Sequence, residues 1–235
     1  WSHKFDDKNH GNLILSTSNY AFNINYNSIG NNNFDLKYNI DEVSAKLKMK
    51  YVYSKEHTFG YGVSSKLYNV SPGSIQPTDD KSIINPLTIN DERGLESAIF
   101  ISDIFEVNKK LSLNLGLRYS VYLGLGESTQ RIYASNSPIT DATLQETNEF
   151  GKNEVYKTYQ GLEYRFSGRY FLNPELSLKA SFNRSFQFIH RLSNNTSASP
   201  TDAWKLSDTN IKPQEAIQAS LGIFKNFDVN AFELS

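Results

Sequence analysis

The sequence predicts an all-β chain that forms part of an antiparallel transmembrane β-barrel. Three observations point to this fold class: long segments of alternating apolar and polar residues, polar links that alternate between short and long, and a composition with 14 Tyr and 15 Phe among 235 residues. The mean hydropathy is only −0.51. A low value is compatible with a barrel, because a barrel strand needs apolar residues only at every second position.

The first two predicted strands, 13–26 and 34–53, each change phase part-way along. Apolar residues occupy odd positions at the start of 13–26 and even positions later, and 34–53 slips in the opposite sense. A one-residue slip is what a β-bulge produces. We therefore expect a bulge in each of these strands. Residues 57–69 and 95–107 are the next two predicted strands.

The clearest strand is 111–123, where every odd position is apolar or aromatic. Strict alternation places side chains on two opposite faces of a strand. Its 13 residues, at about 3.3 Å each and tilted by about 40°, cover about 33 Å of the membrane normal. That length crosses a hydrocarbon core of about 30 Å. Strands of soluble proteins usually have only about 5–6 residues.

Three further strands follow at 162–172, 176–188 and 217–223, and a fragment starts near Val229. Arg184 interrupts the apolar face of 176–188, and we expect it at headgroup level, where a long side chain extends to water. In all, eight or nine strands are expected.

The links between these strands alternate in length. Short links are expected at 54–56, 108–110, 173–175 and 226–228, and long links at 70–93, 124–157 and 192–214. Outer-membrane barrels have short turns on the periplasmic side and long loops outside. A soluble sandwich has no reason to sort its loops in this way.

Several function classes are excluded or disfavoured. No run approaches the roughly 20 apolar residues of a spanning helix, and a net charge of −1 argues against nucleic-acid binding. The absence of Cys excludes disulfides and thiolate sites. The four His are scattered and no catalytic motif is present, so we expect no enzyme, cofactor or metal site. The pair Asp79-Asp80 is expected to be a solvated loop turn.

Two stretches carry a more specific signal. The first is Leu-Tyr-Asn-Val-Ser-Pro-Gly-Ser-Ile-Gln-Pro at 67–77. The second is a series of segments: Ser-Leu-Lys-Ala-Ser-Phe-Asn-Arg-Ser-Phe-Gln-Phe-Ile-His-Arg-Leu-Ser-Asn-Asn-Thr at 177–196, Ser-Pro-Thr-Asp-Ala-Trp at 199–204, Asn-Ile-Lys-Pro-Gln at 210–214 and Ser-Leu-Gly-Ile-Phe-Lys-Asn-Phe at 220–227. Both resemble barrel segments of TonB-dependent receptors from Bacteroidetes-type bacteria, and with residues 111–120 the resemblance covers most of 57–227.

The resemblance implies a 22-stranded barrel in the bacterial outer membrane, closed by an N-terminal plug domain and importing a bulky nutrient with energy supplied through TonB. Residues 1–235 would then be part of one barrel domain, and no plug or TonB-box segment is recognisable in them. The sequence starts at Trp1, without Met or a signal peptide, and we expect an internal piece of a longer polypeptide. The implied partners are outer-membrane lipid, the TonB complex through the plug, and a surface lipoprotein or another envelope protein.

The candidate ligand-binding residues lie on the polar face of the strands or in a loop. They are Arg118, Glu163, Arg165, Arg169 and Lys179 on the lumen side, and Trp204 in the last long link. An Arg or Lys facing lipid at the bilayer midplane costs about 2–4 kcal/mol, which favours the lumen. The charges would line a solute path, or instead form cross-strand ion pairs or contact the plug. Trp204 would stack on a ligand, or instead fold against its own loop.

Two other functions stay open at this stage. One keeps the barrel but makes it part of a surface or secretion complex that binds a protein partner. The other is a soluble all-β sandwich that acts as a ligand-binding module, which would require strands of five or six residues and an apolar face between two sheets.

Overall fold

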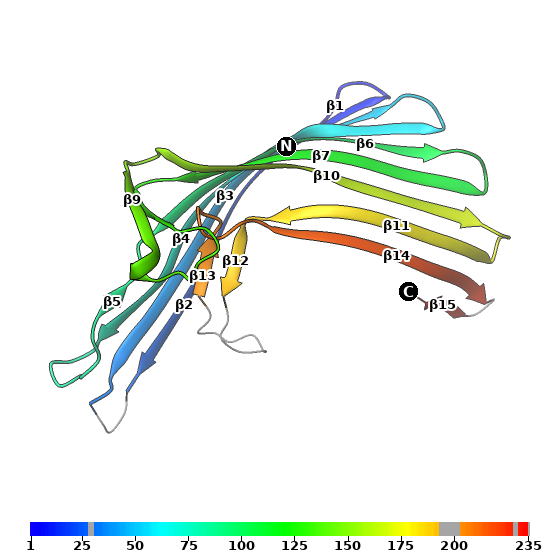
Figure 1. Ribbon diagram of the computed structural model, residues 1–235. Helices are drawn as coiled ribbons and strands as arrows, with labels where there is room; N and C mark the ends of the chain where they lie inside the picture. The colour runs from blue at the N-terminus through cyan, green and yellow to red at the C-terminus, as the bar shows by residue number, and fades with distance from the viewer. Residues whose placement is uncertain (28–30, 193–202, 228–229, 235) are drawn as a thin grey trace.

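The computed structural model describes residues 1–27, 31–192, 203–227 and 230–234. These residues form one large antiparallel sheet, which is curved and open rather than closed into a barrel (Figure 1). Its strand order is β1-β2-β3-β4-β6-β7-β10-β11-β14-β15, with the short β5 paired to β4. The bounds are Ser2–Lys4 (β1), Asn9–Tyr26 (β2), Phe34–Val52 (β3), His57–Pro77 (β4), Leu87–Thr88 (β5), Glu92–Glu106 (β6), Leu111–Leu125 (β7), Val155–Phe171 (β10), Leu176–Gln187 (β11), Gln214–Phe227 (β14) and Asn230–Leu234 (β15).

Two small hairpins lie beside the large sheet. One pairs β8 (Ser128–Tyr133) with β9 (Leu144–Phe150), with a 3-10 turn at Asp141–Thr143 between them. The other pairs β12 (Ile189–Leu192) with β13 (Ala203–Leu206) and lies under the concave side of the sheet (Figure 1). Among the described residues, none belongs to a helix that is long and apolar enough to cross a membrane.

The predicted strands are all present, and several are longer than expected. Strand β4 continues to Pro77 and strand β10 already begins at Val155. The extra residues contain Pro, Gly and polar side chains and lack strict alternation, because they lie beyond the apolar belt, where no lipid demands it. The fragment expected near Val229 appears as β15, and Val229 itself lies outside the described residues.

The expected bulges in 13–26 and 34–53 are wrong. The β2–β3 ladder is unbroken from the pair Asn9/Tyr51 to the pair Tyr26/Phe34. The phase change has another cause: toward one end of these strands, the side chains on the concave face of the sheet are aromatic. There Tyr20 and Phe22 pack on the buried Tyr38, with ring centroids 5.8 and 5.2 Å away.

A register shift does occur in the β3–β4 ladder, between Lys37 and Asn39 of β3. Pro72 and Gly73 of β4 lie there opposite the single residue Tyr38. This is a β-bulge on the neighbouring strand. Its signal in the sequence is the Pro-Gly pair itself and not a change of apolar phase.

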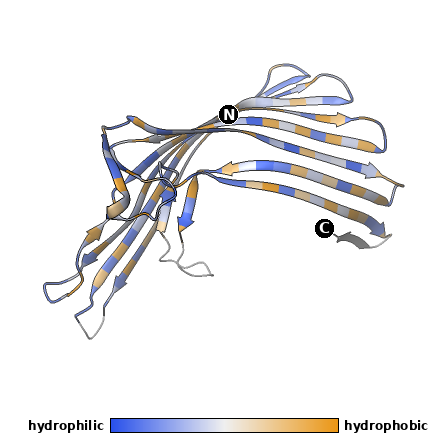
Figure 2. Cartoon of the chain, in the orientation of Figure 1, coloured by the Kyte–Doolittle hydropathy of each residue, from blue (hydrophilic) through white to orange (hydrophobic). Residues whose placement is uncertain are grey.

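The two faces of the sheet differ in chemistry, as the alternating hydropathy along the strands in Figure 2 shows. One row of directly paired residues runs across six strands of the outer face and is entirely apolar or aromatic: Leu13, Leu47, Val63, Ile99, Tyr119 and Leu162. The adjacent row on the concave face contains Asn12, Lys48, Gly62, Phe100, Arg118 and Glu163. The concave face is therefore the lumen side.

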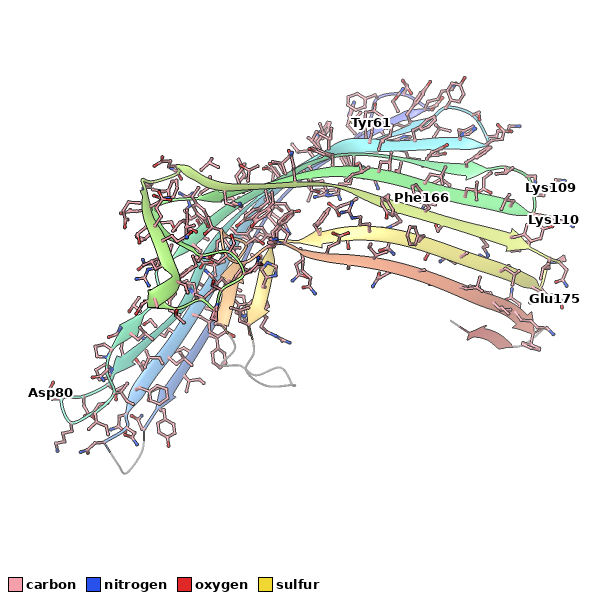
Figure 3. All side chains as sticks on the ribbon, viewed as in Figure 1. Tyr61, Asp80, Lys109, Lys110, Phe166 and Glu175 are labelled. Atoms are coloured by element: carbon pink, nitrogen blue, oxygen red, sulfur yellow. The ribbon has the colours of Figure 1, made fainter. Side chains whose placement is uncertain are left out.

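The short turns gather at one end of the sheet, where Figure 3 labels Lys109, Lys110 and Glu175, and the loop with Asp80 lies at the other end. In four turns the side-chain oxygen of the first residue accepts hydrogen bonds from the backbone amides two and three positions later, at 2.7–3.2 Å. The four residues are Asp6, Ser54, Asn108 and Asn173. Such Asx and Ser turns close a hairpin through local contacts alone.

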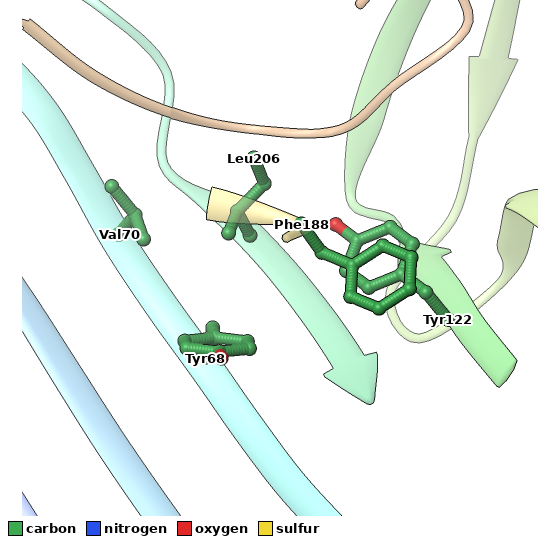
Figure 4. Packing of buried hydrophobic residues seen from close by; sticks show 5 residues of the cluster. All are labelled: Tyr68, Val70, Tyr122, Phe188 and Leu206. Atoms are coloured by element: carbon green, nitrogen blue, oxygen red, sulfur yellow. The ribbon is translucent and has the colours of Figure 1, made fainter. Parts of the chain in front are cut away.

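Five buried apolar side chains form a cluster on the lumen side (Figure 4). Its members are Tyr68 and Val70 of β4, Tyr122 of β7, Phe188, and Leu206 of β13. The rings of Tyr122 and Phe188 stack with centroids 4.8 Å apart and planes 5° apart. The cluster fixes the inward hairpin β12–β13 to the wall.

Candidate functional site

Arg118 is the centre of a polar network on the lumen wall. Its guanidinium pairs with Glu96 at 3.1 Å and with Glu163 at 3.3 Å, and it donates to Ser64 Oγ at 3.0 Å. Glu163 lies directly opposite Arg118 in the β7–β10 ladder. Arg118 and Glu163 therefore form a cross-strand ion pair, which is one of the roles that the sequence left open for them.

A hollow of about 510 Å³ lies beside this network. Ser102 and Gly116 lie side by side in the ladder and leave the space over the sheet open, since a Cβ on Gly116 would meet no atom closer than 3.7 Å. Arg118 and Glu163 border the hollow on one side. Polar side chains of the concave face that also line it are Lys46, Lys48, Asn114, Arg165, Asn183 and Ser185.

Arg169 and Lys179 lie away from this hollow, among the residues nearer the short turns. They are direct cross-strand neighbours in the β10–β11 ladder. Arg169 donates to Ser177 Oγ at 3.1 Å and lies over the ring of Phe171 at 4.5 Å. Two like charges placed opposite each other repel, so this pair attracts negative charge.

Trp204 lies in strand β13, opposite Arg191 of β12, and not in an irregular loop as predicted. It packs against the buried cluster described above. Trp204 is therefore half-buried beside the cluster that fixes the inward hairpin to the wall. The Pro-Thr-Asp segment that precedes it in the sequence lies outside the described residues.

The inward hairpin is fixed by a second polar network that the sequence did not reveal. Lys205 pairs with Glu92 of β6 and, at 3.0 Å, with Asp208, and the Leu206 amide donates to Glu92 at 2.7 Å. Tyr159 donates to the Asp208 carbonyl at 2.7 Å. Burial would lower the pKa of Lys205, but Glu92 and Asp208 more than offset this effect and raise it above its ordinary 10.5.

His190 of β12 is buried, and its Nε2 lies 2.8 Å from Ser207 Oγ. Burial lowers the pKa of His190 below its ordinary value of 6.5, and the nearby Asp208 carboxylate opposes this only in part. The hairpin is therefore held with His190 neutral. No group of three or more His, Asp and Glu side chains in the described part of the chain is placed to hold a metal ion.

Lys46 and Lys48 were not predicted as site residues, although the sequence places them on the lumen face. Both alternate with the apolar Ala45 and Leu47 of β3, which places them on the lumen face. Nothing in the pattern predicted Glu92, Lys205 and Asp208, because a network between the ends of β6 and β13 depends on how the hairpin folds inward.

Comparison with protein families identifies the architecture. The family model described as the β-barrel of TonB-dependent receptor-like proteins matches residues 1–235. This chain belongs to that family. The TonB-dependent receptors are proteins of the Gram-negative outer membrane, which makes the outer face of the sheet the lipid face. A search of curated proteins finds none that matches the chain.

Solved structures share the fold at low sequence identity. The copper transporter OprC has a TM-score of 0.59 and 10% identity over 96% of this chain and 35% of its own. The receptor FpvA of P. aeruginosa, bound to heterologous pyoverdines, gives 0.57 and 15% over 96% of this chain and 29% of its own. The ferric yersiniabactin uptake receptor FyuA of Yersinia pestis gives 0.53 and 11% over 95% and 32%. The chain thus spans about a third of the length of these proteins.

Proposed function

We propose that this chain is part of the wall of a TonB-dependent importer that takes up a bulky solute across the outer membrane. The lumen hollow beside Arg118 carries the proposal: it is a concave polar surface of a size suited to a small molecule, between strands whose other face is apolar. Wall charges in such a position tune which solute passes a barrel. The proposed role involves transport and no catalysis.

The whole receptor would contain a plug domain that closes the barrel and transmits energy from the TonB complex. Residues 1–235 would be one part of the barrel domain, surrounded by outer-membrane lipid. The motifs at 67–77 and 177–227 favour a receptor of the Bacteroidetes type, and a surface lipoprotein is a reasonable further partner for such a receptor. Arg165 is an exposed candidate at the hollow, and Arg118 and Glu163 would shape the wall around it.

A deletion strain tests this function. Two matched neighbours are described as a copper transporter and a ferric yersiniabactin uptake receptor, so metal chelates are the first solutes to try. Uptake of radioactive iron as ferric citrate, and of copper(II), would be compared in wild-type, deletion and complemented strains. We expect a defect for at least one chelate, restored by the full-length protein and abolished by a protonophore.

A barrel that binds a protein partner would give a different result. The deletion would then leave uptake of every solute in a wider nutrient panel unchanged, while the detergent-extracted receptor would retain a stoichiometric envelope protein. Full-length protein found only in the soluble fraction of lysed cells would argue against both functions.

A further inference from the structure

We propose that the lumen hollow beside Arg118 binds an anionic group, a carboxylate or phosphate of a small solute, through Lys46, Lys48 and Arg165. This deepens the proposed function, on which its biological meaning rests. The binding itself is a property of the wall and is tested separately below.

Charge balance around the hollow is the first step. Both carboxylates on this part of the wall, Glu96 and Glu163, already contact Arg118. No ion pair among the described residues involves Lys46, Lys48 or Arg165. Lys46 lies over the ring of Phe100 at 5.4 Å, which leaves its charge uncompensated by a carboxylate. The concave wall around the hollow thus carries four cations, Lys46, Lys48, Arg118 and Arg165, against the two carboxylates of Glu96 and Glu163, a net charge of +2.

The placement of these cations is the second step. Lys46 and Lys48 follow each other on the inner face of β3. Arg165 comes from β10, and strands β4, β6 and β7 lie between it and β3. All three side chains are exposed on the part of the wall that this chain forms. Arg165 offers a planar fork of donors, the geometry that carboxylates and phosphates accept in bidentate fashion.

The shape of the wall favours a small solute over an acidic protein surface. A docked protein surface needs only a flat charged patch, whereas here an open floor at Gly116 and Ser102 creates a hollow of about 510 Å³. Pockets of roughly 300–1,000 Å³ are typical for small molecules. Asn114, Asn183 and Ser185 supply further groups that could orient a polar solute.

The test uses the full-length receptor in detergent, with pyrophosphate and citrate as anionic probes and sucrose as a neutral probe. Titration calorimetry at low salt should detect both anions and no sucrose, and the anion affinity should fall as salt screens the charges. The double variant K48Q/R165Q should weaken anion binding by about tenfold or more, since it removes two charge-assisted donors, whose hydrogen bonds are stronger than neutral ones.

The matched control is K157Q, which removes a lumen-side cation of β10 outside the hollow, where Lys157 lies over the ring of Tyr159. It should change the affinity less than about twofold, the change expected from a weak, screened interaction. Equal losses in K157Q and K48Q/R165Q would show general charge attraction and overturn the proposal. An absence of anion binding would also overturn the proposal. A third contrary outcome is a K48Q/R165Q variant in which the melting temperature of the closed receptor falls while anion affinity is unchanged. That result would assign these cations to contact with an acidic protein surface. A receptor that binds pyrophosphate yet shows no uptake defect on deletion would retain this inference and contradict the proposed function.

Discussion

At the scale of single residues, Arg118 shows how the lumen wall accommodates a partly buried charge. Two carboxylates from neighbouring strands and the Ser64 hydroxyl satisfy its guanidinium. Charge-assisted hydrogen bonds of this kind are stronger than neutral ones, and leaving one partner unpaired is costly. The pair Arg118–Glu163 should therefore contribute to the stability of the wall.

Replacing Glu163 with Gln keeps the shape of the side chain and removes its charge. We expect the free energy of unfolding to fall by about 1–3 kcal/mol, because Arg118 and Ser120 both lose a charged acceptor. The check is the urea midpoint at which the compact band on unheated gels disappears. The exposed Glu175→Gln, in a short turn, should leave the midpoint unchanged; equal midpoints for both variants would mean that the Arg118–Glu163 pair is too solvated to matter.

The sequence predicted these residues better than it predicted their roles. Alternation in β7 and β10 placed Arg118, Glu163 and Arg165 on one face, and the structure confirms that face. Which charges pair and which stay open depends on strand register. Arg118 meets Glu163 because they are direct partners in the ladder, and Lys48 remains unpaired because its partner on β4 is Gly62.

At the scale of the element, Gly94 of β6 and Gly124 of β7 lie directly opposite each other, and aromatic rings cover both. A Cβ on Gly94 would lie 2.5 Å from Tyr122 Oη, and one on Gly124 would lie 2.6 Å from Tyr156 Cε2. Tyr122 is fully buried and stacked on Phe188, so it has no room to move aside. Glycine is required here by packing.

The variant Gly94→Ala should therefore destabilise the protein by about 1–3 kcal/mol through overpacking. Gly116→Ala is the matched control, eight positions from Gly124 along β7, since its Cβ would meet only ordinary contacts. It should be neutral or stabilising by up to about 1 kcal/mol, because alanine loses less backbone entropy than glycine. Thermal melting of the two purified variants distinguishes these results, and identical melting curves would contradict the packing argument.

The inward hairpin should respond to acid through His190. The folded state lowers its pKa, so protonation favours the undocked hairpin; the stabilisation is present above about pH 6.5 and is lost as the pH falls toward the lowered value. Lys205, Glu92 and Asp208 surround the site, and the raised pKa of Lys205 keeps it charged throughout.

The measurement is hydrogen exchange at the Ser207 amide, which donates to the Phe188 carbonyl at 2.8 Å. Its protection factor, corrected for the intrinsic pH dependence, should drop on acidification. Amides of the β6–β7 ladder serve as the internal control, and their protection factors should not change on acidification. In His190→Asn the drop should disappear, and a drop that persists would assign it to another group.

At the scale of the whole molecule, the two chemistries of the sheet predict opposite effects of one substitution. Ile101 and Ile104 both lie in β6, three positions apart and thus on opposite faces, with 52% and 46% of their surfaces exposed. Ile101→Lys places a charge in lipid at a cost of up to about 2–4 kcal/mol near the midplane, whereas Ile104→Lys places it in the lumen. We expect poor assembly of the first variant only, measured as the heat-modifiable fraction in outer membranes.

Alternation and loop lengths were sufficient to predict the class of fold, the spanning strands and the ends at which the turns lie. The extensions of β4 and β10 and the hairpins β8–β9 and β12–β13 were not predicted. Outside the apolar belt no lipid imposes a period of two, so tertiary contacts such as Lys205 with Glu92 and Asp208 decide the structure there.

The shared hydrogen-bond pattern of the four turns at Asp6, Ser54, Asn108 and Asn173 has a kinetic consequence. Each turn joins strands that are neighbours in sequence, so loop closure there involves only a few residues and little chain entropy. Contacts close in sequence favour fast folding. Four hairpins are thus able to nucleate independently and early, and the slow event of assembly should be the lateral joining of finished hairpins through ladders such as β2–β3, β4–β6 and β7–β10.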